Sequence, residues 1–235
     1  SKTDLLALQG QLRGRVASGE KDFVLWNAIS VLAEVMKVYH ALELLETQGV
    51  VALYKYMEKL NSEATTSKVK AVKNVVKDLN FRSALIKVQK LWDQKFEHPK
   101  LVELQRIIEN EVKVNKDVKI IVFNQYRDNA LDIEEKLNKI SEVKAKIFVG
   151  QMKKGETGYT QKEQKAVLDK FRIGEFNILV ATSVGEEGLD VPKVDLVVFY
   201  EPIPSAIRHI QRRGRTGRQE KGRVIILMTK GTRDE

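Results

Sequence analysis

The stretch FNILVATSVGEEGLDVPKVDLVVFY, from Phe176 to Tyr200, decides the fold class. It places one short apolar run at 176–181 and another at 194–200, on either side of a polar loop that contains glycines. Short runs rich in Val, Ile and Leu are typical of strands that are buried on both faces, as in parallel sheets. The working loops of such sheets follow the carboxyl ends of the strands, so the loop between these two runs is a candidate functional segment.

Alternating helix and strand patterns surround this stretch. Pro99 suits the first position of a helix predicted over 99–112. Further strands are predicted over 118–123, 144–149 and 222–228, helices over 127–140 and 161–172, and a short helix around 205–211. Strands that alternate with helices predict an α/β fold with a doubly wound parallel sheet.

Residues 1–98 differ in character, because helical patterns follow one another there without a single proline. After a short amphipathic segment, helices are predicted over 23–48, 50–60, 69–79 and 82–96, with a polar loop at 61–67. In the first of these helices, the apolar positions at helical spacing are Ile29, Leu32, Val35, Met36, Tyr39, Leu42 and Leu45. The chain is therefore predicted to have an all-α domain at 1–98 and an α/β domain at 99–235.

The face of the predicted 69–79 helix opposite its valines carries Lys70, Lys73 and Lys77, with Lys68 directly before it. A solvated helix surface is the commoner explanation of such a face, and a stripe that contacts phosphates is the alternative. Trp92 lies on the apolar stripe of the 82–96 helix and is predicted to be a core residue rather than a base-stacking platform.

The composition narrows the class of partner. The 235 residues carry a formal net charge of +9, which favours a polyanionic partner. The absence of cysteine excludes disulfides and thiolate chemistry, and the three histidines are too scattered to predict a metal site. No apolar run is long enough to span a membrane and no signal peptide is recognised, so an intracellular location is expected, in the cytoplasm, nucleoid or nucleus.

The run Gln211–Arg218, QRRGRTGR, concentrates four arginines in eight residues. Its two glycines would weaken an amphipathic helix, so the pattern suits a helix end and loop that aim several guanidinium groups at one polyanion. The planar guanidinium fork matches phosphate oxygens. A loose nucleic-acid-binding patch is the alternative for this run alone.

Ala181–Pro192 and the 211–218 run resemble motifs V and VI of superfamily 2 helicases, in that order. In these enzymes two RecA-like domains close over ATP, so the resemblance implies a RecA-like fold for 99–235. It implies that Arg215 and Arg218 are arginine fingers, which neutralise charge on the transferred phosphoryl group. Other implied nucleotide-binding positions are Gln211, Arg212, Gly188 and Asp190.

Motif V holds further candidates. The resemblance implies that the Asp190 carboxylate accepts a hydrogen bond from the ATP ribose. The alternative is a loop carboxylate that caps a turn. Thr182 and Ser183 are small hydroxyl donors at a strand end, and they suit contacts to a sugar–phosphate backbone.

Phe123–Asp128 resembles motif IV of the same enzymes. Gln125, Tyr126 and Arg127 then become candidates for nucleic-acid contacts, with Tyr126 able to stack on a base; an ordinary strand-to-helix turn is the alternative. Gly150 and Gln151, after the next strand, are further candidates. The segment 150–157 nearly spells a phosphate-binding loop, but Glu156 stands where the lysine belongs and would repel phosphate.

The chain contains no Gly-x-x-x-x-Gly-Lys-Ser/Thr and no Asp-Glu-x-Asp/His sequence. Those elements hold the phosphates, Mg²⁺ and the attacking water in such ATPases. This chain is therefore expected not to hydrolyse ATP alone. ATP and Mg²⁺ would require an N-terminal RecA-like domain, which is the predicted intramolecular partner.

A more specific resemblance is to archaeal Hef and FANCM-type helicases, carried by Val38–Gly49, Glu97–Leu101, Ile121–Asp128, Phe148–Gln151, Val184–Pro192 and Glu201–Arg218. It implies ATP-driven unwinding or remodelling of DNA forks and flaps, with a helical insert domain that helps to grip branched DNA. Asn124 departs from the Thr or Ser that is commoner in this family. RIG-I-like and Dicer-type enzymes share the insert, so half of an RNA helicase is one alternative, and a non-catalytic nucleic-acid-binding module is another.

Overall fold

The computed structural model describes residues 2–149, 159–182, 193–202 and 222–235. The chain divides into two compact units, Ser1–Glu97 and His98–Glu235. The helix predicted around 205–211 and the 150–157 segment lie outside the described residues.

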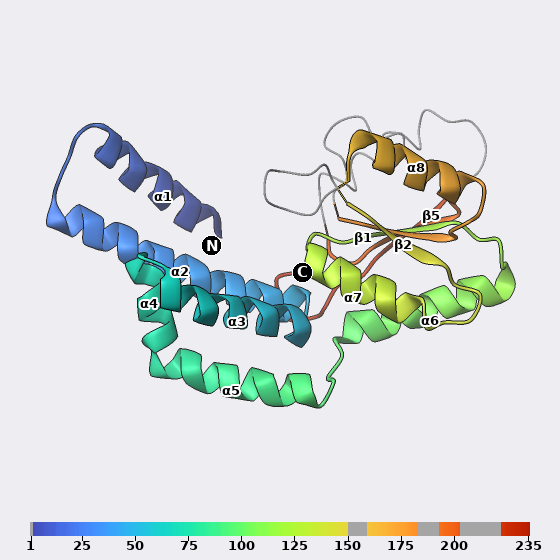
Figure 1. Ribbon diagram of the computed structural model, residues 1–235, viewed down its shortest axis with the longest axis horizontal. Coiled ribbons are helices and arrows are strands. Elements are labelled where there is room, and N and C mark those ends of the chain that lie inside the picture. Colours follow the sequence, from blue (N-terminus) through green and yellow to red (C-terminus); the bar gives the residue numbers. More distant parts are fainter. Residues whose placement is uncertain (1, 150–158, 183–192, 203–221) are drawn as a thin grey trace. The chain divides into compact units, whose positions relative to one another are not determined.

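The first unit is entirely helical in the residues described (Figure 1). Its helices are α1 (Lys2–Ala17), α2 (Phe23–Thr47), α3 (Val50–Thr66), α4 (Lys70–Lys77) and α5 (Leu79–Asp93). The Asp22 side chain caps the start of α2 by accepting from the Val24 amide. The chain turns sharply after α2 at Gly49, whose φ of 97° favours glycine.

Two small cores hold this unit together. Leu12 of α1 packs with Leu25 and Leu32 of α2, and a second cluster joins α3 to α5. In that second cluster the Trp92 ring stacks on Tyr54, with ring centroids 4.9 Å apart. Trp92 is therefore part of the packing between α3 and α5, as predicted for a core residue.

The sequence prediction for residues 61–67 is wrong. The polar segment 61–67 is not a loop, because α3 continues to Thr66 through residues that include neither glycine nor proline. The predicted apolar stripe of α2 is buried only in part. Val35, Leu42 and Leu45 remain 40–46% exposed, because a helix that is apolar on most sides cannot bury every face against α1, α3 and α4.

The second unit contains a five-stranded sheet in which every pairing is parallel. The strands are β1 (Ile120–Phe123), β2 (Ala145–Phe148), β3 (Ile178–Ala181), β4 (Leu196–Phe199) and β5 (Arg223–Ile226), in the spatial order β2-β3-β1-β4-β5. The helices are α6 (Pro99–Val114), α7 (Arg127–Leu137) and α8 (Gln161–Arg172).

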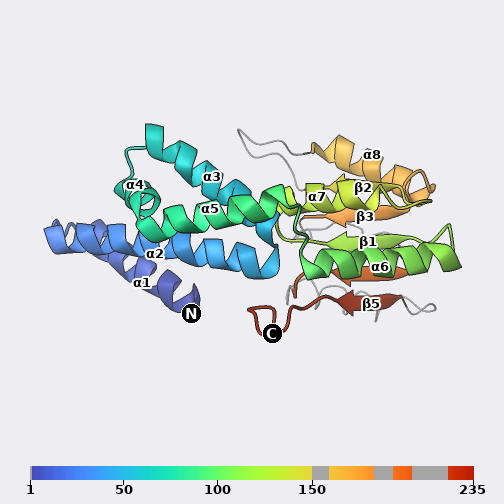
Figure 2. The same ribbon diagram turned by 90° about the horizontal axis from the view of Figure 1, so that it is seen from below.

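Helices cover both faces of this sheet (Figures 1 and 2). Ile120 and Val122 of β1 pack in the cluster that contains α6 and α7. The intervening Ile121 and Phe123 pack in the cluster that contains α8. Because successive strand side chains point to opposite faces, one apolar run serves two cores. The predicted doubly wound α/β fold, preceded by a helical domain, is confirmed.

None of the helices in the described ranges is long and apolar enough to cross a membrane. Nor do three or more His, Cys, Asp or Glu side chains within those ranges form a group that could hold a metal ion.

Candidate nucleic-acid and nucleotide interface

The carboxyl edge of the sheet brings together segments that are far apart in the sequence. Backbone ladders continue one residue past the strands here, since the Asn124 amide donates to Ala181 O at 2.9 Å and the Thr182 amide donates to Phe148 O at 3.0 Å. Phe123 and Ala181 are register partners, so Asn124 and Thr182 follow them at the same level of the sheet. The motif IV and motif V candidates thus meet at one edge.

A tight turn follows β1 at residues 124–127. Asn124 is only 1% exposed, and its Oδ1 accepts the Tyr126 amide at 2.9 Å. This bond fixes the turn as an Asx turn, the conformation in which an Asn or Asp side chain replaces a backbone acceptor. Gln125 is exposed, whereas Tyr126 and Arg127 are half-buried.

The turn leads directly into α7. Tyr126 is the N-cap residue, with extended backbone and no side-chain cap, and Arg127 is the first helical residue. The first turn of a helix carries backbone N–H groups that the helix itself does not use, and these suit an anionic ligand. Gln125, Tyr126 and Arg127 therefore stand next to a feature that can accept a phosphate.

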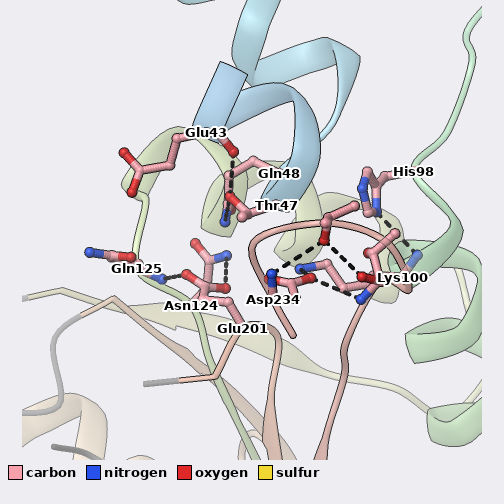
Figure 3. A network of polar contacts seen from close by, with 11 residues as sticks. Glu43, Thr47, Gln48, His98, Lys100, Asn124, Gln125, Glu201 and Asp234 are labelled. Atoms are coloured by element: carbon pink, nitrogen blue, oxygen red, sulfur yellow. Dashed lines mark hydrogen bonds and ion pairs between the residues drawn. The ribbon is translucent and has the colours of Figure 1, made fainter. Parts of the chain in front are cut away.

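A buried carboxylate lies behind this turn (Figure 3). Glu201, two residues after β4, is 4% exposed. Its Oε2 accepts the Asn124 side-chain amide at 3.2 Å, and its Oε1 accepts the Gln125 backbone N–H. The residues that follow β1 and β4, neighbours in the sheet, are thus tied together by one side chain.

A buried ion pair lies in the same unit (Figure 3). The Lys100 ammonium, in the first turn of α6, contacts the Asp234 carboxylate and lies 4.9 Å from the centre of the Tyr200 ring. Burial lowers the pKa of Lys100, whereas Asp234 and Glu201 favour its charged form and oppose that shift. Burial, reinforced by the neighbouring Glu201, raises the pKa of the Tyr200 hydroxyl.

Glu201, Lys100 and Asp234 were not among the residues predicted from the sequence. One signal was available for Glu201, because this carboxylate follows closely on a run of apolar residues. Buried carboxylates need partners, so such a position merits attention. No comparable signal marks Lys100 and Asp234, which are 134 positions apart.

All six predicted nucleotide-binding residues fall outside the described ranges. They are Gly188, Asp190, Gln211, Arg212, Arg215 and Arg218, together with the nucleic-acid candidates Gly150, Gln151 and Ser183. Of the predicted site residues, the structure describes Gln125, Tyr126, Arg127 and Thr182, and it brings these four to the same edge of the sheet.

Comparisons with known proteins agree with this architecture. Residues 100–220 match the family of the helicase conserved C-terminal domain, and residues 1–95 match a family described as the helical bundle of an ATP-dependent RNA helicase. The crystal structure of the Pyrococcus furiosus Hef helicase domain is similar over 100% of this chain and 47% of its own, with 49% identity and a TM-score of 0.77.

Two curated relatives show the same relationship in sequence. An ATP-dependent RNA helicase of Methanocaldococcus jannaschii is 40% identical over 237 residues, covering 100% of this chain. The ATP-dependent DNA helicase fml1 of Schizosaccharomyces pombe is 33% identical over 237 residues, covering 98% of this chain. The chain spans only 28% of the length of either relative. From its parallel sheet, its preceding helical bundle and these matches, the chain belongs to the Hef/FANCM-type superfamily 2 helicases, of which it contains the helicase C-terminal domain.

Proposed function

We propose that this chain is part of an ATP-dependent DNA helicase or translocase that acts on forks, flaps and other branched DNA. In that enzyme the chain supplies the second RecA-like domain and the helical insert, with motifs IV, V and VI. The observation that carries the proposal is the meeting of the 124–127 turn and Thr182 at one edge of a parallel sheet. Such an edge is where ligands of doubly wound folds bind.

The 124–127 turn and Thr182 suit contacts to a nucleic-acid backbone. Thr182 carries a hydroxyl donor, Arg127 stands at the start of α7, and the Tyr126 ring offers a stacking surface. These groups recognise phosphate, sugar and base faces rather than a particular sequence. A helicase that moves along DNA of any sequence needs contacts of this kind.

The helical unit adds a basic surface. Between residues 68 and 95, eight Lys and Arg side chains stand against two Asp and Glu. On α4 the side chains of Ala71, Val72 and Val75 are buried, which leaves Lys70, Lys73 and Lys77 exposed on the other faces of the helix. Within the part of the chain that the structure describes, these three lysines form no ion pair. Unpaired ammonium groups in a row suit the evenly spaced phosphates of DNA.

ATP and Mg²⁺ enter the proposal through the longer protein. Arg215 and Arg218 act as arginine fingers, Gln211 and Arg212 contact the nucleotide, and Asp190, beside Gly188, binds the ribose. A preceding RecA-like domain of the same protein, the partner of this chain, holds the phosphates and the metal ion. The motif order and the family membership of residues 100–220 support these assignments.

One specific observation favours RNA as a second candidate substrate. The Methanocaldococcus jannaschii relative, which matches the whole chain, is named as an RNA helicase. The Schizosaccharomyces pombe relative is named as a DNA helicase. The two names therefore call for a direct comparison of substrates.

The test uses the complete protein that contains this chain. ATP hydrolysis is measured with forked DNA, linear duplex DNA and double-stranded RNA at equal nucleotide concentration. Strongest stimulation by forked DNA supports the proposal, and strongest stimulation by RNA replaces it with the RNA-directed activity. If no nucleic acid stimulates hydrolysis, the chain belongs to a nucleic-acid-binding protein without helicase activity.

A further inference from the structure

We propose that Glu201 is a positioning residue, which holds the 124–127 turn in the shape that presents Gln125, Tyr126 and Arg127 to nucleic acid. Glu201 does not contact the nucleic acid in this proposal; it acts through Asn124 and the Gln125 backbone. The proposal deepens the nucleic-acid-binding function and rests on it for one of its two measurements.

The contacts of Glu201 define this role. One carboxylate oxygen accepts the Asn124 side-chain amide and the other accepts the Gln125 backbone N–H. Asn124, which Glu201 holds in place, fixes the next residue in turn, because its Oδ1 accepts the Tyr126 backbone amide. Two consecutive backbone amides of the turn are thus fixed by side chains of residues that are themselves almost fully buried.

A buried carboxylate needs a reason, because removing a charge from water is unfavourable unless partners compensate. Lys100 supplies nearby positive charge and is itself held 2.9 Å from Asp234. An apolar side chain at position 201 would continue the apolar character of β4 without any of these partners. The polar arrangement is therefore better explained by the shape it gives to the turn than by stability.

Glu201 also lies between two motifs, the turn of motif IV and the arginine run of motif VI. Glu201 stands ten residues before Gln211, on the segment that continues into the arginine run of motif VI. Its partners belong to the turn of motif IV, on the neighbouring strand of the sheet. If Glu201 moved, its carboxylate oxygens would move with it. The hydrogen bonds that they accept from Asn124 and Gln125 would then change, and so would the shape of the 124–127 turn.

The hydrogen bond between the side chains of Asn124 and Glu201 provides a sharp test, because its donor and acceptor can be exchanged by substitution. In Glu201→Gln, the oxygen of the new side-chain amide can still accept from the Gln125 N–H. The NH₂ group of that amide then faces the NH₂ group of Asn124, so two donors face each other. Asn124→Asp places two carboxylates together. The double variant restores complementarity, since the new amide at position 201 donates to the new carboxylate at position 124. The oxygen of that amide still accepts from Gln125, and the carboxylate still accepts from Tyr126.

The first measurement is hydrogen exchange at the Gln125 and Tyr126 amides in the whole chain. Each single variant is expected to accelerate exchange at Gln125 or Tyr126 by about tenfold, the effect of losing one hydrogen bond of ordinary strength. The double variant is expected to return close to the wild-type rates. Glu103→Gln, which changes a surface carboxylate paired with Arg106, is the matched control and should leave both amides unchanged.

The second measurement is the affinity of the same proteins for forked DNA. Each single variant should bind about tenfold more weakly, and the double variant should recover most of the affinity. Placed on an Arg127→Ala background, Glu201→Gln should add little, because both changes act on the same contact. Full additivity would mean that Glu201 affects binding elsewhere, and would overturn the proposal.

Thermal unfolding of each variant separates positioning from general destabilisation. If Glu201→Gln fails to fold, Asn124→Asp and the double variant carry the comparison. Unchanged exchange in the single variants, or a double variant no better than either single one, would refute the role of Glu201. If the wild-type chain binds no DNA, the proposed nucleic-acid surface is wrong, and the exchange rates alone then decide whether Glu201 shapes the turn.

Discussion

The Lys100 ammonium and the Asp234 carboxylate lie 2.9 Å apart, and their side chains are 4% and 1% exposed. Asp234 Oδ2 also accepts the Thr229 backbone amide at 3.0 Å, so the turn after β5 is fastened to the first turn of α6. Removal of one member of a buried pair leaves the other charge without compensation, which is strongly destabilising. The pair is thus a sensitive point of the α/β unit.

We expect Asp234→Asn to lower the free energy of unfolding of this unit by about 3 kcal/mol or more. Urea denaturation of the wild-type chain and the variant measures the difference. Glu103→Gln breaks the exposed pair with Arg106 and should change the same quantity by less than about 1 kcal/mol. Equal effects of the two substitutions would show that the buried pair contributes no more to the free energy of unfolding than the exposed one.

The arginine-finger assignment predicts a loss of catalysis without a loss of binding. In the complete protein, Arg215→Ala or Arg218→Ala should reduce DNA-stimulated ATP hydrolysis by a factor of about 10³ or more, because transition-state charge is left unneutralised. DNA affinity, measured in the absence of ATP, should stay within a few-fold of wild type. Arg106→Ala, on the surface of α6, is the control, and normal turnover in either finger variant would contradict the assignment.

The exposed lysines of α4 predict a change in salt dependence. Replacing Lys70, Lys73 and Lys77 by Gln should weaken binding of DNA. For each lysine that binds a phosphate, the slope of log K against log salt should become shallower by up to about 0.9. Fluorescence anisotropy titrations at several salt concentrations give both quantities.

A control with the same change of charge is available for this experiment. Lys116, Lys139 and Lys170 are each paired with a glutamate at the surface of the α/β unit, so replacing these three should have a smaller effect on the slope. An equal effect of the two triple variants would indicate that net charge, rather than the α4 face, attracts the DNA.

The helical unit should lose stability in alkaline solution through Tyr56. Burial raises the pKa of its hydroxyl to about 12, from an ordinary value of 10.0. Below pH 10 the hydroxyl keeps its proton in both states, and this contribution to stability is fully present. Between about pH 10 and 12 the unfolded chain releases the proton and the folded one retains it, so stability falls as the pH rises.

We expect this fall to reach about 1–2 kcal/mol by pH 12, less than the full shift implies because solvent screens a half-buried ring, and to be absent in Tyr56→Phe. The difference in unfolding free energy between the two proteins, measured across the pH range, isolates this tyrosine from the other titrating groups. A constant difference from pH 9 to 12 would contradict the prediction.

β1, β3 and β4 could be predicted from sequence because each is a short apolar run whose residues are all buried. Phe176–Tyr200 contains β3 and β4, with ends that differ by at most two residues from the predicted ones. Helix starts were equally clear where a specific residue marks them, as Pro99 does for α6. The predicted end of α3 is wrong because polar residues favour a loop, although no residue there stops a helix.

The support of the candidate site could not be predicted in the same way. Resemblance to a motif predicts Gln125, Tyr126 and Arg127, because a motif consists of residues that are contiguous in the chain. Glu201 lies 77 positions from Asn124, and only the pairing of β1 with β4 brings the two together. A contact that depends on strand order is invisible until that order is known.

The order of strands in the sheet also has a consequence for the way the protein is made. β1, the central strand, pairs with β3 and β4, both of which come later in the chain, and β2 pairs with β3. Because β1 and β2 are not neighbours, a nascent chain cannot begin this sheet until β3 has left the ribosome. The contacts of the helical unit are local, and its helices are synthesised before the strands. We therefore expect this unit to fold before β3 and β4 are available to pair with β1.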